Sequence, residues 1–482
     1  MTPANRKHLK QLFDADFLNK YDLDPNRFVD NITSDSREVG LNTLFLARSG
    51  VNTNGANFIT EAILQGACLI LSDSQVKRDK ITPIPILYLP HFNVILCDLL
   101  SRFYDVNLSN MTFIAVTGTN GKTSVAYMLA ESLNGAYVGT IGIGVLNSLN
   151  ETKNTTPSLG VLMPFFSDFL KKNISSCALE ISSHALVQQR LLGLPLKTAV
   201  FTNLSHDHLD YHGTMQAYAD SKYELFLNYP IQNAVVSIDD TWGQALIKQL
   251  PNTIKRFSYG LNTNADIYPL KMIESMEGIN VTLATPKGNA TFYLGLIGQF
   301  NVLNAMAVVG VMLFEGYELA SIINKIESLS SIQGRMEVVC QSPYVVVDYA
   351  HTPDALDKAL SALKRLCQGQ LWCVFGCGGD RDITKRPLMG QAVEKHADVM
   401  VITNDNPRSE SPQVIIEAIK QGMKSSEAVI VISDRAQAIK HCFEHALSGD
   451  VILVAGKGHE DYQIIGNKTH FFSDRKCIEL LM

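Results

Sequence analysis

Short apolar runs that end in small and polar residues recur along the chain, a pattern that predicts an α/β protein. Near the N-terminus, residues 58–73 have the pattern of a helix that stops at Gly66 and leads into a strand. The proline-rich residues 82–90 are expected to form an edge strand or a loop, because proline cannot donate a hydrogen bond to a neighbouring strand. A helix is predicted over residues 93–104, and the polar residues 105–111 are expected to be a linker.

The pattern is clearest from residue 112 onward. Residues 112–118 are almost continuously apolar, as buried parallel strands are, and they lead into a glycine loop and a helix predicted over residues 122–133. Three more strands of this design are predicted at residues 175–182, 198–205 and 233–240. Ligands of an open parallel sheet gather at the carboxyl ends of its strands, so the polar residues at these ends are candidates for a binding site.

A second alternation of strands and helices begins after the string SSIQGRMEVV, residues 330–339. Its apolar strands are predicted at residues 344–350, 371–379, 398–405, 428–434 and 450–458. The whole chain is therefore predicted to have an α/β fold of three domains. These domains are residues 1–108, residues 109–333 with a central P-loop ATPase-type parallel sheet, and residues 334–482 with a Rossmann-like doubly wound sheet.

The composition is that of a folded protein, with 482 residues, 46% of them hydrophobic and 18% charged. The 41 Lys and Arg against 47 Asp and Glu give a formal net charge of −6, which argues against a general nucleic-acid-binding or acidic-membrane-binding protein. The longest apolar run, residues 305–314, is about half a membrane span. The N-terminus has no apolar signal segment, and nine scattered cysteines favour reduced thiols. We therefore expect a cytoplasmic protein without membrane insertion.

The segment AVTGTNGKTS, residues 115–124, carries the strongest chemical signal. A strand leads through two glycines into a helix, so backbone N–H groups and the helix N-terminus can point at phosphate oxygens. Lys122 is expected to reach the terminal phosphates, and Thr123 or Ser124 to offer a hydroxyl to Mg²⁺. The spacing differs from the common G-x4-G-K-[ST] loop, and a simple glycine turn with a surface lysine is the alternative. Such a loop by itself is compatible with kinases, GTPases, motor ATPases and ligases.

Two groups of polar residues follow later strands. Glu180 ends one predicted strand, and Asp207, His208, Asp210 and His212 follow another. Oxygen ligands suit Mg²⁺, whereas a carboxylate that satisfies backbone donors at a helix start is the alternative for Glu180. Closely spaced histidines also suggest zinc. A zinc site needs three or four ligands at fixed geometry, however, and the phosphate loop already calls for Mg²⁺.

The chain resembles the Mur ligases, enzymes that add amino acids to the cell-wall precursor. Ten strings carry the resemblance, in the family's order: TGTNGKTS, NTTPS, EISSHALVQQR, TNLSHDHLDYHG, GLIGQFNVLNA, GRME, DYAHTPDAL, GCGGDRDITKRP, TNDNPRSE and AGKGHEDYQ. With the SDSR string at residues 34–37, the resemblance covers nearly the whole chain. It implies a UDP-binding N-terminal domain, a central ATP-binding domain and a C-terminal amino-acid-binding domain, and it accounts for the short phosphate loop.

The resemblance implies residues that bind ATP and magnesium. For ATP these are Gly118, Thr119, Asn120, Gly121, Lys122, Thr123, Ser124, Asn301, Asn304, Arg335 and Asp348, with His351 close by. Two Mg²⁺ ions are expected at Thr123 or Ser124, Glu180, His208 and Lys222, and catalytic roles at Lys122, Lys222, His208 and Glu180. By sequence pattern alone, Lys222 is a solvated helix lysine. In the family the matching lysine is carbamylated by CO₂ to N6-carboxylysine, an anion that can hold Mg²⁺.

The resemblance also implies two further sets of binding residues. The UDP-sugar peptide is expected to contact Ser34, Ser36, Val51, Asn52, Thr53, Asn154, Thr155, Thr156, Ser182, Gln188 and Arg190. The incoming amino acid is expected to contact Arg381, Asp405, Asn406, Pro407, Arg408, Gly456 and Glu460.

The string DNPR, residues 405–408, indicates which amino acid is added. Within the family it accompanies meso-diaminopimelate, which is lysine with a second carboxylate at its far end. A guanidinium matches a carboxylate in a bidentate manner, so Arg408 is the candidate for that carboxylate. The resemblance thus implies an ATP-dependent amide ligase that acts on UDP-N-acetylmuramoyl-L-alanyl-D-glutamate through an acyl phosphate.

Other readings of the phosphate loop remain as alternatives. Folylpolyglutamate synthase shares the short loop, but the DNPR string and the N-terminal SDSR segment argue against it. A P-loop kinase for a small acid and a non-catalytic nucleotide switch are the other two. The GCGGDRD string is not a GxGxxG motif, which argues against NAD binding. We expect small-molecule substrates, no nucleic acid and a monomer.

Overall fold

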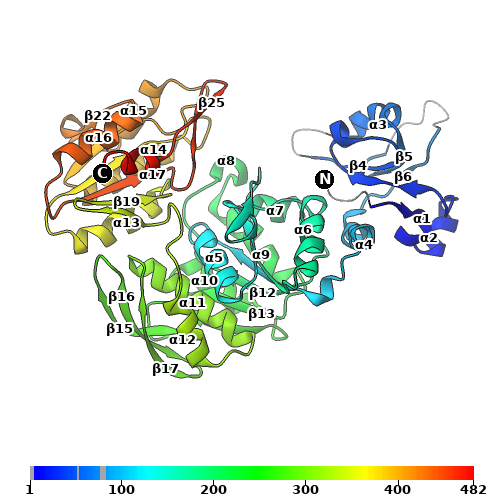
Figure 1. Cartoon of the computed structure of the whole chain (residues 1–482), viewed down its shortest axis with the longest axis horizontal. Helices are drawn as coiled ribbons and strands as arrows, with labels where there is room; N and C mark the ends of the chain where they lie inside the picture. The colour runs from blue at the N-terminus through cyan, green and yellow to red at the C-terminus, as the bar shows by residue number, and fades with distance from the viewer. Residues whose placement is uncertain (1–4, 51–53, 76–82) are drawn as a thin grey trace. The chain divides into compact units, whose positions relative to one another are not determined.

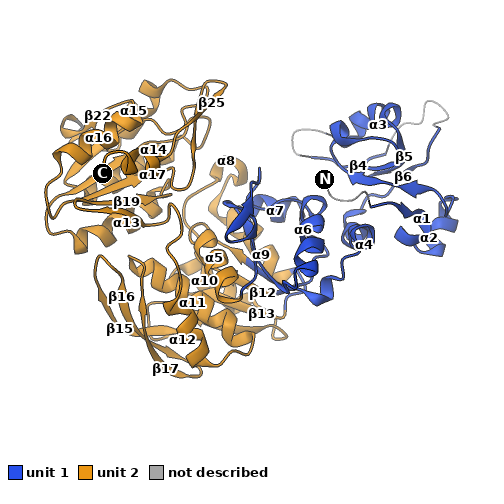
Figure 2. Ribbon diagram, in the orientation of Figure 1, with its two compact units in different colours: residues 1–115, 134–197, 228–231 blue, residues 116–133, 198–227, 232–482 orange. Residues whose placement is uncertain are grey.

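The computed structural model describes residues 5–50, 54–75 and 83–482. The chain divides into two compact units (Figure 2). The first unit consists of residues 1–115, 134–197 and 228–231, and the second of residues 116–133, 198–227 and 232–482. Figure 1 shows α-helices and β-strands in both units, as the apolar pattern predicts.

The N-terminal part of the first unit contains a parallel sheet of four strands. In spatial order these are β3 (Asn31–Thr33), β4 (Thr43–Ala47), β5 (Ala67–Ser72) and β6 (Ile86–Tyr88). Helix α3 (Ile59–Gln65) ends at Gly66 and leads into β5, as predicted. The proline-rich segment forms the edge strand β6, which also agrees with the prediction. The predicted helix before the linker is α4 (Asn93–Tyr104), which packs against α6 (Leu159–Lys171).

The largest sheet has eight strands in the order β10-β9-β8-β11-β7-β12-β13-β14. The strands are β7 (Thr112–Thr117), β8 (Ala136–Gly139), β9 (Gly142–Val145), β10 (Ser148–Asn150), β11 (Ser176–Glu180), β12 (Leu196–Phe201), β13 (Asn233–Ser237) and β14 (Lys255–Tyr259). Pairs such as β12 with β13 are parallel, whereas β9 pairs antiparallel with both of its neighbours. The sheet therefore places β7, the strand before the phosphate loop, among its inner strands.

Helices of the second unit surround the start of the phosphate loop. Helix α5 (Lys122–Ser132) follows the loop and packs against α11 (Gln299–Phe314), which also contacts β13 and β14. Nearly all of α11 is buried, as expected for a helix that is apolar on all sides. Helix α9 (Met215–Leu227) carries Lys222.

A three-stranded antiparallel sheet in the second unit has no counterpart in the sequence predictions. It consists of β15 (Tyr268–Glu274), β16 (Ile279–Thr285) and β17 (Gly288–Leu294), and α12 (Leu319–Glu327) packs against β17. Buried and exposed residues alternate along the first part of β16, because one face of the sheet is covered.

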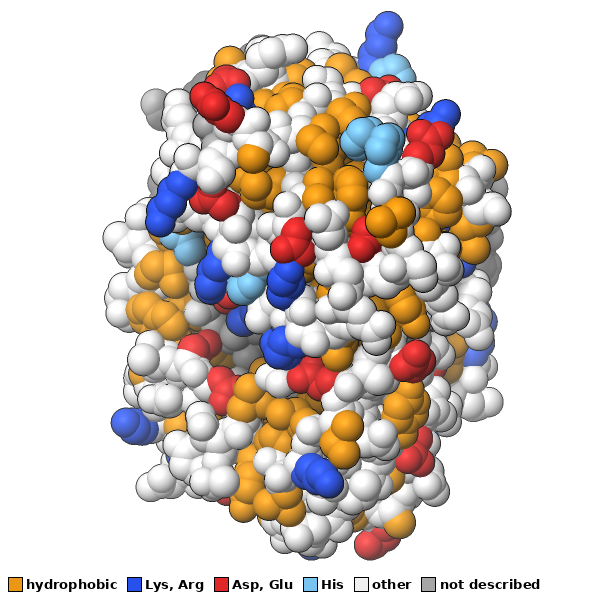
Figure 3. Space-filling model, turned by 90° about the vertical axis from the view of Figure 1, so that its left-hand side faces the viewer, with side chains coloured by type: hydrophobic (Ala, Val, Ile, Leu, Met, Phe, Trp, Pro, Cys, Tyr) orange, Lys and Arg blue, Asp and Glu red, His pale blue; other side chains and the backbone are white. Residues whose placement is uncertain are grey.

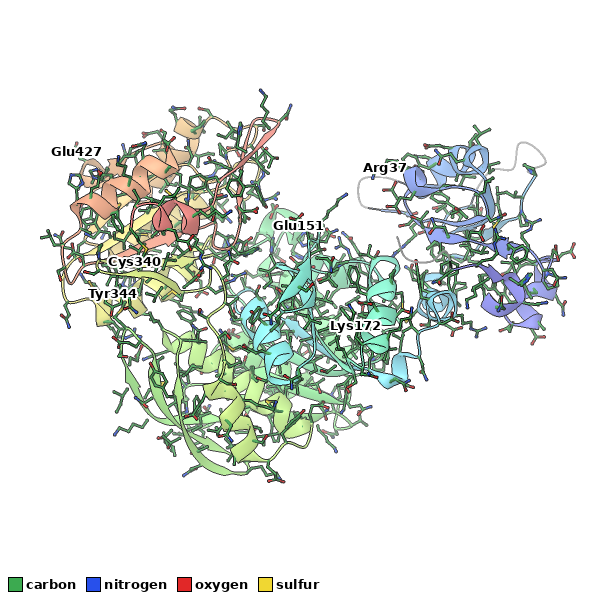
Figure 4. All side chains as sticks on the ribbon, in the orientation of Figure 1. Arg37, Glu151, Lys172, Cys340, Tyr344 and Glu427 are labelled. Atoms are coloured by element: carbon green, nitrogen blue, oxygen red, sulfur yellow. The ribbon has the colours of Figure 1, made fainter. Side chains whose placement is uncertain are left out.

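The C-terminal part of the second unit contains a six-stranded sheet in the order β18-β19-β23-β20-β21-β22. The strands are β18 (Glu337–Gln341), β19 (Tyr344–Asp348), β20 (Leu371–Phe375), β21 (Val399–Ile402), β22 (Ile430–Val431) and β23 (Val451–Ala455). All pairs are parallel except the β18–β19 hairpin, where the labelled Cys340 and Tyr344 lie (Figure 4).

Helices cover both faces of this sheet, which confirms the predicted doubly wound arrangement. Helices α13 (Pro353–Leu366), α14 (Lys385–His396) and α15 (Pro412–Lys420) contribute to the core on one face. Helices α16 (Arg435–His445) and α17 (Asp474–Glu479) contribute to the core on the other face. The hairpin of β24 (Tyr462–Ile465) and β25 (Lys468–Phe471) lies between β23 and α17 in the chain.

Three general properties complete the description. All nine cysteines are free thiols. In the described part of the chain, no helix has the length and apolar character needed to cross a membrane. On the face shown in Figure 3, Lys and Arg side chains are interspersed with Asp and Glu side chains.

A fully buried ion pair joins α16 to α17. Arg435 Nε and Nη2 donate to the two carboxylate oxygens of Asp474 at 2.7 and 2.8 Å, and both side chains are 0% exposed. Arg435 Nη2 also donates to the carbonyl oxygen of Ala455, at the end of β23, at 2.8 Å. The pair therefore ties two helices to the strand end that precedes Gly456.

We predict that Asp474→Asn lowers the free energy of unfolding by about 3–5 kcal/mol, because removal of one partner leaves a buried charge unpaired. Urea denaturation followed by circular dichroism measures this change. The control is Glu479→Gln, which removes an exposed partner of Arg475 on the same helix and should have little effect. A change at Asp474 no larger than that of the control would contradict the prediction.

Candidate active site

The phosphate loop has the backbone that the sequence predicts. Gly118 follows β7 with φ of 149°, and Gly121 is the N-cap of α5 with φ of 83°. A Cβ atom added to Gly118 would lie 1.9 Å from Thr202 Oγ1 and 3.0 Å from the carbonyl oxygen of Asn203. Only glycine fits there, so the backbone of the loop lies directly against the segment that follows β12.

Two residues that we did not predict hold the loop in shape. Asn203 Oδ1 accepts from the backbone N–H of Asn120 at 2.9 Å, and Asn203 Nδ2 donates to the carbonyl oxygen of Asn120 at 3.0 Å. Thr202 Oγ1 donates to the same carbonyl oxygen at 2.6 Å. Both residues lie near the start of the string that contains His208, where the sequence analysis considered only charged and histidine side chains.

Two lysines converge on the loop. Lys122 Nζ donates to the carbonyl oxygens of Gly118 and Thr119 at 2.9 and 2.7 Å. Lys222 Nζ donates to the same Gly118 carbonyl oxygen at 2.8 Å and is 4.6 Å from the centre of the Tyr218 ring. Lys222 is 1% exposed, so its interpretation as a solvated helix lysine is wrong.

Burial lowers the pKa of Lys222 well below its usual range, and the nearby charge of Lys122 lowers it further. Asp207 opposes this shift but does not cancel it. This shift favours the neutral form of the Lys222 ε-amino group, the form that can act as a nucleophile.

A second set of ionisable residues surrounds Asp207. Burial by itself would raise the pKa of Asp207, but His208, His351 and Lys385 outweigh it and lower the pKa to about 2. Burial and the charge of Lys385 lower the pKa of His351 to about 4. At neutral pH the site therefore holds an ionised Asp207 and a neutral His351. Among the described residues, no three His, Cys, Asp or Glu side chains are grouped as ligands of a metal ion.

Residues from other parts of the second unit reach the loop. Arg335 Nη2 donates to Thr123 Oγ1 at 3.0 Å, and the guanidinium carbon is 4.3 Å from the centre of the Tyr349 ring. Asn304 Nδ2 donates to Asn301 Oδ1 at 3.1 Å. A Cβ atom on Gly121 would lie 2.8 Å from Asn304 Oδ1. The structure thus brings Arg335 and Asn304 to the loop, and their contact with a nucleotide stays a prediction.

Asp348 has a different local role. Its carboxylate accepts from the backbone N–H groups of Met336 and Ala350, each at 2.8 Å. Burial raises the pKa of Asp348, although Arg335 opposes the change. Contact of Asp348 with a nucleotide stays a prediction.

Glu180 lies at the end of β11 in the first unit and is 0% exposed. Its carboxylate accepts from the Tyr137 hydroxyl and from the backbone N–H of Thr140, the latter at 2.9 Å. Glu180 therefore satisfies a backbone donor, but this donor belongs to the segment after β8 rather than to a helix start. Its role as a magnesium ligand stays a prediction.

Several residues expected to bind the UDP-sugar peptide lie together in the first unit. Thr156 Oγ1 donates to the Glu180 carbonyl oxygen at 2.8 Å and lies 3.3 Å from Ser182 Oγ. Arg190 Nη1 donates to the Thr156 carbonyl oxygen at 2.8 Å, and Arg190 Nε donates to Gln188 Oε1 at 2.9 Å. The result is a hydrogen-bonded group of polar side chains after β11.

The other residues expected to bind the UDP-sugar peptide lie in several segments of the first unit. Thr155 Oγ1 is 3.1 Å from Thr140 Oγ1, and the backbone N–H of Asn154 donates to Thr152 Oγ1. Ser34 is exposed and Ser36 is buried, at the segment after β3. Val51, Asn52 and Thr53 lie outside the described residues.

The residues expected to bind the amino acid converge at the carboxyl ends of β21 and β23. Asn406 Nδ2 donates to Glu460 Oε2 at 3.0 Å. Gly456 has φ of 112°, and a Cβ atom on it would lie 2.7 Å from Asp405 Oδ2. Asp405 and Asn406 are buried, although each is polar. Burial raises the pKa of Glu460, while the charge of Lys457 opposes this and that of Asp405 adds to it.

Arg408 lies at the edge of this group. It has φ of 51°, and its backbone N–H donates to the Ile464 carbonyl oxygen at 3.1 Å. Its Nη1 donates to the Gly379 carbonyl oxygen at 2.7 Å. A Cβ atom on Gly378 would lie 2.9 Å from that Nη1 and 3.7 Å from Arg381 Cγ, so the two predicted arginines lie on adjoining loops.

An ion pair not predicted from the sequence holds these loops together. Arg386, which is 2% exposed, donates to both carboxylate oxygens of Glu410 at 2.8 and 2.9 Å. Glu410 also accepts from the backbone N–H of Asp380, whose carboxylate accepts from Ser409 Oγ at 2.7 Å. Pro407 lies in the same segment, and its carbonyl oxygen would be 1.9 Å from a Cβ atom on Gly379.

Comparison with known proteins identifies two domains. The model of the Mur ligase middle domain matches residues 116–312, and that of the Mur ligase glutamate ligase domain matches residues 334–458. These matches cover the phosphate loop and most of the residues expected to bind the amino acid.

Similar proteins cover nearly the whole chain. UDP-N-acetylmuramoyl-L-alanyl-D-glutamate–2,6-diaminopimelate ligase of Coxiella burnetii (strain RSA 493 / Nine Mile phase I) is 39% identical over 483 residues, 98% of each chain. The protein of the same name from Haemophilus influenzae (strain PittEE) is 41% identical over 467 residues, 92% of this chain and 94% of the other. A solved structure of a protein with this name is 36% identical, with a TM-score of 0.68 and 95% of each chain covered.

We predict that Gly118→Ala weakens ATP binding by roughly tenfold or more, because the new Cβ atom must displace Thr202 and strain the backbone. Equilibrium titration with a fluorescent ATP analogue measures the affinity. Gly160→Ala is the control, since its Cβ atom would meet only Ser158 Oγ at 4.0 Å. Equal affinities for the two variants would show that the close approach at Gly118 has no role in nucleotide binding.

Proposed function

The chain belongs to the Mur ligase family, and from that premise we propose that it joins 2,6-diaminopimelate to UDP-N-acetylmuramoyl-L-alanyl-D-glutamate with the use of ATP. The observation that carries the proposal is the convergence of Asp405, Asn406, Arg408 and Glu460 in a chain that matches ligases of this name at 39–41% identity. Arg408 is a partner for a carboxylate, and Asp405 and Glu460 are partners for ammonium groups, so the set suits an amino acid that carries both kinds of group.

The proposed reaction has two steps. An oxygen of the D-glutamate γ-carboxylate attacks the γ-phosphorus of ATP, ADP leaves, and an acyl phosphate forms. The neutral amino group of the acceptor then attacks the acyl carbon, inorganic phosphate leaves, and the amine loses a proton. The first step brings two anions together, so the positive charge of Lys122 beside the phosphate loop lowers its barrier.

Residues of the loop and of the segment after β12 are compatible with magnesium. Thr123, Ser124 and His208 offer oxygen and nitrogen donors, and carbamylation of Lys222 would replace a buried amine with an anionic oxygen ligand. The lowered pKa of Lys222 favours the neutral amine, which is the form that reacts with CO₂. Mg²⁺, when bound, supplies positive charge that offsets the charge of the phosphates. We propose two ions, with Glu180 as a further ligand.

The acceptor pocket accounts for the choice of amino acid. Arg408 is proposed to bind the distal carboxylate, with Arg381 on the adjoining loop. Asp405 and Glu460 are proposed to face the ammonium groups, next to the small residue Gly456. Lysine lacks the distal carboxylate, so its binding would leave Arg408 without that partner.

The first unit is proposed to bind the other substrate. Thr156, Ser182, Gln188 and Arg190 form one hydrogen-bonded group, suited to the peptide portion of the UDP-sugar. The reaction belongs to the synthesis of the peptidoglycan precursor, and we propose that the protein performs it in the cytoplasm as a monomer without nucleic-acid partners.

Phosphate release tests the proposed function. The protein is incubated with ATP, Mg²⁺ and UDP-N-acetylmuramoyl-L-alanyl-D-glutamate, in parallel with meso-diaminopimelate, with L-lysine and with no amino acid. We expect release only with meso-diaminopimelate, with a product whose mass is that of the UDP-tripeptide. Release with lysine would overturn the acceptor assignment, and release in none of the three would overturn the function.

We predict that Arg408→Ala raises the KM for diaminopimelate roughly 30-fold or more, since it removes one partner of a charge pair with the substrate. The KM for ATP should stay within about twofold. The control is Arg365→Ala, which removes a half-exposed arginine of α13 that pairs with Glu274. Steady-state kinetics for both variants measure the effect, and an unchanged diaminopimelate KM would remove Arg408 from the acceptor site.

We predict that Lys222→Ala lowers kcat roughly 100-fold or more, because the proposed carbamate is lost from the site of phosphoryl transfer. A small carboxylate such as acetate should restore part of the activity by entering the space left by the side chain. Lys248→Ala, an exposed lysine on the helix α10 (Thr241–Gln249), is the control. Full activity of Lys222→Ala in bicarbonate-free buffer would exclude the proposed role.

A further inference from the structure

We propose that Lys457 is a positioning residue for the acceptor amino acid, which sets the orientation of Glu460 and Asn406. The proposal rests on the proposed function, because it concerns the pocket assigned above to diaminopimelate. Lys457 is one residue after Gly456 and is not among the predicted site residues.

The side chain of Lys457 is enclosed among the acceptor residues. It is 0% exposed, and its Nζ is 3.2 Å from Glu460 Oε2 and 3.4 Å from Asn406 Oδ1. The ammonium group also lies 5.4 Å from the centre of the Tyr462 ring. A long cationic side chain is seldom buried to this extent unless it is paired, and here its charged end meets two residues of one pocket.

The contacts of Lys457 determine which way the Asn406 amide faces. Asn406 Oδ1 accepts from Lys457 Nζ and from the backbone N–H of Ile464, the latter at 2.9 Å. Its Nδ2 therefore faces Glu460 Oε2, to which it donates at 3.0 Å. Glu460 Oε2 thus receives hydrogen bonds from Lys457 and Asn406, and these two bonds restrain the position of that oxygen.

The charge of Lys457 has a second consequence. Burial and the neighbouring Asp405 both raise the pKa of Glu460, whereas Lys457 lowers it. Without Lys457 this opposing charge would be lost, so the pKa of Glu460 would rise further and its protonated form would be favoured. A protonated Glu460 would attract an ammonium group less strongly, so Lys457 also maintains the charge that the acceptor recognises.

The test uses Lys457→Met, which keeps the length and apolar stem of the side chain but removes its charge. We expect the KM for meso-diaminopimelate to rise roughly tenfold or more, while the KM values for ATP and for the UDP-sugar peptide stay within about twofold. The control is Lys440→Met, which has the same change at a lysine paired with Glu444 on the surface of α16. An acceptor KM equal to that of the control would overturn the proposal.

A double-mutant cycle distinguishes positioning from a general loss of stability. If Lys457 acts through Glu460, adding Lys457→Met to Glu460→Gln should raise the acceptor KM far less than it does in the unaltered protein. In the double variant no Glu460 carboxylate is left unpaired by the loss of Lys457. It can therefore be compared with Glu460→Gln even if Lys457→Met alone does not fold. A further tenfold rise in the double variant would show that Lys457 does not act through Glu460.

Failure of this proposal is distinguishable from failure of the proposed function. The unaltered protein is assayed first, and absence of diaminopimelate ligation there would overturn the function itself. Normal ligation by the unaltered protein together with unchanged acceptor KM in Lys457→Met would overturn only the role of Lys457.

Discussion

The amino groups of two lysines share one carbonyl oxygen at the start of the phosphate loop, and the proposed chemistry of the site depends on this arrangement. Lys122 and Lys222 both donate to Gly118, and Lys222 is buried. Burial and, to a smaller extent, the neighbouring charge of Lys122 lower the pKa of Lys222 well below its usual range, which favours its neutral form. The same position is favourable for anions, because phosphate groups and a carbamate would each offset the positive charge beside them.

The proposed acceptor pocket also depends on buried charged groups, but here groups of both signs are present. The half-buried Glu460 pairs with the buried Lys457, and the buried Asp405 lies near enough to Glu460 to raise its pKa. Arg408 and Arg381 lie on the adjoining loops. A substrate with both carboxylates and ammonium groups can complete such a set, whereas a singly charged one leaves a group unpaired. In the proposed function, recognition therefore depends on charges that the loops hold in place before the substrate binds.

The sequence predicts local features well and long-range burial poorly. The strand, glycine loop and helix around Lys122 follow from apolar pattern and glycine spacing, and the helices ending at Gly66 and beginning at Asn93 do so as well. Helix α9 has no strongly apolar face, so its periodicity does not reveal that Lys222 is buried. The hydrogen bonds between Asn203 and Asn120 depend on contacts between distant segments, which a single sequence does not specify. The same holds for the packing of the three-stranded sheet β15–β17.

The central claim is that the site transfers a phosphoryl group from ATP to a carboxylate and then replaces it with an amine. The most direct measurement uses UDP-N-acetylmuramoyl-L-alanyl-D-glutamate labelled with ¹⁸O in the γ-carboxylate, with mass spectrometry of the inorganic phosphate released during ligation to meso-diaminopimelate. An acyl phosphate requires that one ¹⁸O atom move from the carboxylate into each phosphate. Phosphate without ¹⁸O, formed together with the ligated product, would contradict the account.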